Sequence, residues 1–124
     1  MHVYNVEIVT NAVMNTTINS APYNVQQSYG YAIQADFTGT PTGTFTLQAS
    51  NDPATSYMPG NASNTNPVTN WSVITNSSYA VTAAGNYMWN VYDVMYNWVR
   101  LVYTDTSGGT STAVLNANIN AKAP

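Results

Sequence analysis

Side chains that could carry out acid–base or nucleophilic chemistry are scarce in this chain. It has one histidine, His2, and no cysteine among its 124 residues. A Ser-His-Asp triad needs a histidine that the fold holds beside the nucleophile, and we expect His2, next to the first methionine, to be solvated. The carboxylates fall on different predicted elements: Glu7, Asp36, Asp52, Asp93 and Asp105. Two of them could converge for glycoside hydrolysis, but such sites usually need a larger cleft, so the sequence predicts a protein that is not an enzyme.

Asn51 and Asp52 are the residues best placed to bind a cation. Their oxygens and the carbonyls of the following loop could hold calcium at the edge of a sandwich. Asn-Asp-Pro is also a common turn sequence, because Asn and Asp start turns and proline fixes φ, and a turn is the interpretation we favour. The lack of cysteine excludes disulfides and thiolate metal sites. We therefore expect no metal and no other cofactor.

Low charge is the most unusual property of the composition. Charged residues make up 6% of the chain, and the formal net charge is -3. The basic residues are Arg100 and Lys122, too few to neutralise the phosphates of a nucleic acid. A weakly charged surface favours self-association, which suggests that the protein works within an assembly. No apolar run approaches the roughly 20 residues that span a bilayer, and the first residues lack a signal-peptide pattern, so we expect no membrane partner.

Short alternating segments separated by turn residues predict an all-β sandwich. The expected strands are residues 2–10, 12–18, 29–37, 44–50, 71–74, 78–82, 86–91, 98–104 and 112–120. The glycine- and proline-rich residues 38–43 predict a hairpin between the strands that flank them, and residues 105–111 predict another hairpin turn. Residues 51–70 form the longest irregular stretch, and loops of this length are often functional.

The segment of residues 86–104 is rich in aromatic side chains and could be either a ligand-binding platform or a buried core. It holds two of the three tryptophans and four of the ten tyrosines. Tyr87 and Trp89 share one strand face with Val91, and we expect that face to pair with residues 98–104 as core. Tyr96 and Trp98 are expected to face outward, toward a partner. A helix over residues 91–103 is an alternative, because several apolar side chains there have helical spacing.

The succession of five motifs over residues 44–120 resembles that of small β-sandwich proteins in tailed-phage virions. The motifs are FTLQASNDP, NWSVI, GNYMWNV, YNWVRLVYT and STAVLNANI. The same order is similar to the plan of discoidin-like, glycan-binding jelly rolls. Both resemblances imply one antiparallel β-sandwich of jelly-roll type, with about eight strands in a single domain over residues 1–124.

The phage resemblance implies a capsid decoration, or cement, protein. Such a protein is made in the host cytoplasm and binds the major capsid protein on the outer surface of the virion. It also implies a homo-oligomer, with a trimer favoured. We expect residues 1–20, as an N-terminal arm or edge strand, to make intersubunit contact, and the loop of residues 51–70 to be the second candidate. The candidate partner contacts are Val3, Tyr4, Val6, Tyr57, Met58, Tyr96 and Trp98.

The alternative function is that of a tail- or fibre-associated sandwich that binds host glycan. Aromatic rings stack on sugar faces, and amides both donate and accept hydrogen bonds. The candidate glycan contacts are Tyr57, Trp71 and Tyr79, near the long loop. Tyrosine is also common at protein–protein interfaces, so the composition is compatible with both functions.

Overall fold

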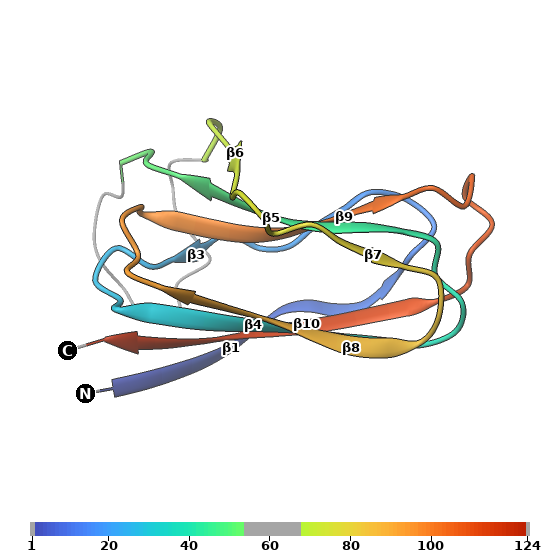
Figure 1. Cartoon of the computed structure of the whole chain (residues 1–124), viewed down its shortest axis with the longest axis horizontal. Helices are drawn as coiled ribbons and strands as arrows, with labels where there is room; N and C mark the ends of the chain where they lie inside the picture. Colours follow the sequence, from blue (N-terminus) through green and yellow to red (C-terminus); the bar gives the residue numbers. More distant parts are fainter. Residues whose placement is uncertain (1, 54–67, 124) are drawn as a thin grey trace.

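The computed structural model describes residues 2–53 and 68–123, and these residues form two antiparallel β-sheets stacked face to face (Figure 1). The described residues contain ten strands and no helix. The two chain termini lie at the same end of the sandwich (Figure 1). The prediction of an all-β sandwich is therefore confirmed, and the alternative of a helix over residues 91–103 is wrong.

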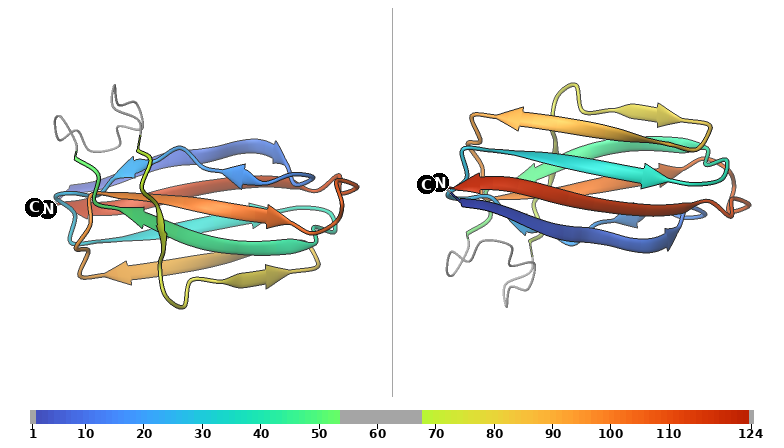
Figure 2. Two further views of the ribbon diagram at one scale, coloured as in Figure 1. Left: turned by 90° about the horizontal axis from the view of Figure 1, so that it is seen from above. Right: turned by 90° about the horizontal axis from the view of Figure 1, so that it is seen from below.

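Sheet A has the strand order β1-β10-β4-β8. Its strands are β1 (His2–Val13), β10 (Val114–Ala123), β4 (Gly30–Phe37) and β8 (Gly85–Tyr92). Figure 2 shows the four strands side by side in the view from below, with β1 at one edge and β8 at the other. The predicted strand over residues 12–18 does not exist as such, because β1 continues to Val13 and the next strand starts at Ile18.

Sheet B is built around two long central strands, β9 (Trp98–Asp105) and β5 (Gly43–Ser50). Two short strands, β2 (Ile18–Asn19) and β3 (Tyr23–Asn24), both pair with β9. Two others, β6 (Ser72–Val73) and β7 (Tyr79–Val81), both pair with β5. Each pair of short strands fills one strand position, so the sandwich has eight positions in two sheets of four.

The order of these positions is that of a jelly roll, in which the chain crosses from one sheet to the other at most connections. The predicted hairpin across residues 38–43 is wrong, because β4 lies in sheet A and β5 in sheet B. Both edges of β4 are already paired, with β10 and with β8, so its successor must cross the sandwich. The predicted hairpin at residues 105–111 is also wrong, because this turn joins β9 in sheet B to β10 in sheet A.

Alternation along each strand sends one set of side chains into the core between the sheets. On β4 the buried set is Tyr31, Ile33, Ala35 and Phe37, which are alternate residues of the strand expected over residues 29–37. Trp89 is also buried, and its ring meets that of Phe45 edge to face across the core, with 5.7 Å between centroids. The aromatic segment is therefore mostly core, although β8 and β9 lie in different sheets and do not pair with each other.

Gly43 marks the closest approach of a backbone to a core side chain. A Cβ at this position would lie 2.3 Å from the Thr104 carbonyl oxygen and 2.5 Å from the Tyr103 hydroxyl. The Tyr103 hydroxyl is itself buried, with no hydrogen-bond partner among the described residues. Burial, and secondarily the charge of Asp105, raise the pKa of Tyr103. Glycine is required here because a side chain would collide with both the strand and the phenol.

Candidate functional site

Strand β1 is the edge of sheet A, so the N-terminal segment is an edge strand and not a separate arm. It pairs with β10 over nearly its whole length, and Ile8 and Val9 are buried in the core. Among the predicted contact residues on β1, Val3 points outward and is 59% exposed. Tyr4 and Val6 lie opposite the buried Ala121 and Ile119, so their side chains are on the inner face and half-buried. Only Val3 of these three presents an outward side chain.

The first half of β1 carries few of the features that protect a sheet edge. Edge strands are usually blunted by bulges, lysine or proline. The register shifts of β1 begin only after Glu7, and residues 2–7 contain no lysine, arginine or proline. The exposed Glu7, at the end of this stretch, is their one carboxylate. Farther along, the Ala21 amide donates to the Ile8 carbonyl at 3.2 Å, so the chain itself occupies part of the edge there. Residues 2–7 are therefore the part of β1 best suited to contact another chain.

Tyr96 and Trp98, the predicted outward contacts, each form a hydrogen bond within the chain. The Tyr96 hydroxyl is 2.5 Å from that of Tyr31, and burial raises the pKa of both phenols. Trp98 lies opposite Ser50 on the outer face of sheet B, yet it is 1% exposed. Its Nε1 donates to the Asp52 carbonyl at 3.1 Å, which places the segment after β5 against the edge of the indole ring. Trp98 therefore faces outward from its strand, as expected, but its side chain is covered within the chain and is not accessible to a partner.

Asp52 closes the base of the long loop. Its carboxylate accepts hydrogen bonds from the backbone amides of Thr69 and Asn70, at 2.8 and 3.1 Å, and from Asn70 Nδ2 at 2.8 Å. The Asn70 side chain and these amides lower the pKa of Asp52. These bonds reach residues 17 and 18 positions farther along the chain, so Asp52 joins the two ends of the loop. Among the described residues, no group of three or more histidine, cysteine or acidic side chains could hold a metal. Tyr57 and Met58 lie outside the described residues.

The described glycan candidates, Trp71 and Tyr79, do not form one site. The Arg100 guanidinium lies 4.3 Å from the centre of the Trp71 ring, and the Tyr79 ring stacks on Tyr87 at 3.8 Å. Each ring therefore has one face covered by another side chain. Trp71 directly precedes β6, which pairs with one end of β5, whereas β7 pairs with the other end. The two rings are thus separated by several residues along β5.

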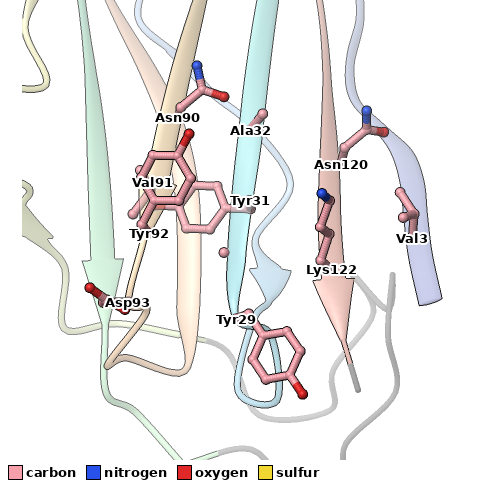
Figure 3. Close-up of a pocket in the computed structure, with 11 residues that line it drawn as sticks. Val3, Tyr29, Tyr31, Ala32, Asn90, Val91, Tyr92, Asp93, Asn120 and Lys122 are labelled. Carbon is pink, nitrogen blue, oxygen red and sulfur yellow. The ribbon is translucent and has the colours of Figure 1, made fainter. Parts of the chain in front are cut away.

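A hollow on the outer face of sheet A is a further candidate site, at the end of the sandwich where the chain termini lie (Figures 1 and 3). Its volume is about 470 Å³, and it lies over β4 between the neighbouring strands β8 and β10. The residues around it come from all four strands of sheet A and the positions next to them: Val3, Tyr29, Gly30, Tyr31, Ala32, Asn90, Val91, Tyr92, Asp93, Asn120 and Lys122. Sequence reasoning did not find this site. Alternation places Gly30 and Ala32 outward, but only the register of the sheet shows which side chains flank them.

None of the described residues form a helix long and apolar enough to cross a membrane. Comparison with models of known protein families gave no match, and comparison with curated proteins gave no similar sequence.

Proposed function

We propose that this protein is a non-enzymatic structural component of a tailed-phage virion, a capsid decoration protein. In this proposal it binds the major capsid protein on the outer surface of the assembled lattice as a homo-oligomer, with a trimer favoured. The observation that carries the proposal is the regular, weakly protected edge of β1 over residues 2–7, next to the exposed Val3. A jelly roll is compatible with this role, since viral capsid proteins use the fold, but lectins use it too.

The mechanism that follows is physical. An exposed sheet edge can accept a strand of another chain, because its outward backbone groups supply hydrogen bonds in register. A protein that binds only the assembled lattice stabilises that state by mass action. An oligomer that holds several capsid subunits adds avidity to modest single contacts. With 6% charged residues, such contacts would depend little on salt.

The glycan-binding alternative through Tyr57, Trp71 and Tyr79 has less support. The rings of Trp71 and Tyr79 are each covered on one face and lie on different parts of sheet B. Sugar stacking needs an accessible ring face, so these two residues are poor candidates.

The test is co-sedimentation of the purified protein with phage capsids that lack it. Deletion of β1 is unsuitable, because Ile8 and Val9 belong to the core and the truncated chain would lose stability. The sharper variant is Val3→Lys, which places a charge at the sheet edge without disturbing the core. Val73→Lys is a matched control, because Val73 has the same 59% exposure as Val3 but lies on sheet B.

The proposal predicts saturable binding at a fixed copy number per capsid, lost in Val3→Lys and kept in Val73→Lys. Absence of binding by the wild-type protein, with the protein found in the tail fraction of intact particles, would reject decoration. Equal binding by both variants would reject β1 as the contact.

A further inference from the structure

We propose that the hollow on the outer face of sheet A binds a short, neutral carbohydrate. The proposal concerns the outer face of sheet A, which shares Val3 with the β1 edge, and it does not depend on the virion assignment. It rests on three properties of the hollow: a floor of small residues, amides on two sides and exposed tyrosines at one end.

The floor is made by β4. Gly30 and Ala32 point outward from this strand, between the inward side chains of Tyr31 and Ile33. Gly30 has a structural reason to be glycine, because a Cβ there would lie 2.7 Å from the Val91 carbonyl oxygen. Gly30 and Ala32 contribute only a hydrogen and a methyl group to the floor, so the longer side chains of β8 and β10 form the sides of the hollow. The result is a hollow of about 470 Å³, within the usual size of a small-molecule site.

Two amides flank the floor at the same level of the sheet. Ala32 pairs with Asn90 on β8 and with Asn120 on β10, so one amide lies on each side of the methyl group (Figure 3). Asn5 Nδ2 donates to Asn120 Oδ1 at 2.5 Å. This bond orients the Asn120 amide and leaves its Nδ2 to donate elsewhere. The Asn90 side chain makes no hydrogen bond to any other described residue. The Asn120 amide can therefore donate to a sugar hydroxyl, and the Asn90 amide can both donate to one and accept from one.

Apolar surface is concentrated around the same hollow. Seven large hydrophobic side chains are exposed among the described residues, and three of them line it: Val3 at 59%, Tyr29 at 56% and Tyr92 at 78%. Tyrosine rings offer an apolar face and a polar hydroxyl. A pyranose ring has matching properties, since its C–H face is apolar and its rim carries hydroxyls.

The charges around the hollow favour a neutral ligand. Lys122 and Asp93 contribute one charge of each sign. A single cation is too few for a nucleic acid strand, which needs several phosphate contacts. The polar amides beside the floor, in turn, disfavour a purely apolar ligand, because their hydrogen bonds to water would be lost without replacement.

The test is a titration of the ¹⁵N-labelled full chain with maltotriose, cellotriose, chitotriose and mannotriose, followed by NMR. We expect at least one sugar to shift the side-chain amide signals of Asn90 and Asn120 and the backbone signal of Ala32 in a saturable way. Tyr92→Ala should weaken that binding by about tenfold, and Ala32→Leu should abolish it by filling the floor.

Met88→Ala is the matched control. Met88 also points outward from β8 and is 46% exposed, but it lies opposite Gln34 and does not line the hollow. The Met88→Ala variant should bind sugar as tightly as the wild type. The dispersion of the NMR spectrum checks that each variant is folded.

Two results would overturn the proposal. One is the absence of saturable shifts at Asn90, Ala32 and Asn120 with all four sugars. The other is that Ala32→Leu, which fills the floor, binds sugar like the wild type, because the sugar would then lie outside the hollow. Neither result bears on capsid binding, which is measured separately with the Val3 and Val73 variants.

Discussion

Replacement of Trp89 by alanine should be among the most damaging single changes in this protein. Trp89 sits on the edge strand β8 of sheet A and is only 7% exposed. Its ring meets Phe45 of sheet B at 5.7 Å and Tyr87 at 4.8 Å, edge to face in both cases. Its Nε1 donates to the Ser77 carbonyl at 2.8 Å, in the segment between β6 and β7. One side chain therefore ties the edge of sheet A to the edge of sheet B.

The expected magnitude follows from two separate losses. Truncation of a buried tryptophan to alanine costs about 3–5 kcal/mol through lost burial and the cavity that remains. The indole hydrogen bond adds a smaller loss, because the Ser77 carbonyl would lack its donor. Trp89→Phe keeps most of the ring contacts but not the hydrogen bond, so we expect a loss of about 1–2 kcal/mol. The two variants together separate the packing contribution from the polar one.

Urea unfolding followed by far-ultraviolet circular dichroism measures both variants without relying on tryptophan fluorescence. Met88→Ala is the control, because the adjacent side chain points outward from the same strand and is 46% exposed. It should change the free energy of unfolding by no more than about 0.5 kcal/mol. If Trp89→Ala lost less than about 1 kcal/mol, the assignment of Trp89 as a tie between the two sheets would be refuted.

Two further predictions concern polar groups. Tyr103→Phe removes a buried hydroxyl that has no hydrogen-bond partner among the described residues. The free energy of unfolding in urea should therefore be equal to or greater than that of the wild type, and a loss above about 1 kcal/mol would contradict this. Hydrogen bonds from Asn70 and Thr69 lower the pKa of Asp52, and hydrogen bonds from Ser107 lower that of Asp105. Their stabilisation is therefore complete above the unfolded-state pKa of about 4 and is lost as the pH falls through the lower, folded-state values. The urea midpoint of the wild type should fall as the pH is lowered from neutral into acid, and that of the double variant Asp52→Asn, Asp105→Asn should fall less. If the two proteins showed the same dependence of midpoint on pH, other groups would control acid unfolding.

The sequence by itself determined which face of the regular strands β4 and β8 is buried. The alternation of Tyr31, Ile33, Ala35 and Phe37 is a local pattern with a period of two residues, and it predicts the inner face correctly without knowledge of the neighbouring strands. The same local logic identified Trp89 as core. Alternation combined with the spacing of turns was also enough to predict the sandwich class.

The tertiary structure alone decided which strands are neighbours. The turn of residues 38–43 has the composition of a hairpin, but both edges of β4 are occupied by β10 and β8, which lie far away in the sequence. Trp98 is on an outward strand face and is nevertheless buried, with its Nε1 bonded to the Asp52 carbonyl of the segment after β5. The hollow on sheet A exists only because the register sets Asn90 and Asn120 on either side of Ala32. Which side a residue faces is set by its own strand, whereas what lies beside it depends on long-range pairing that local sequence patterns do not encode.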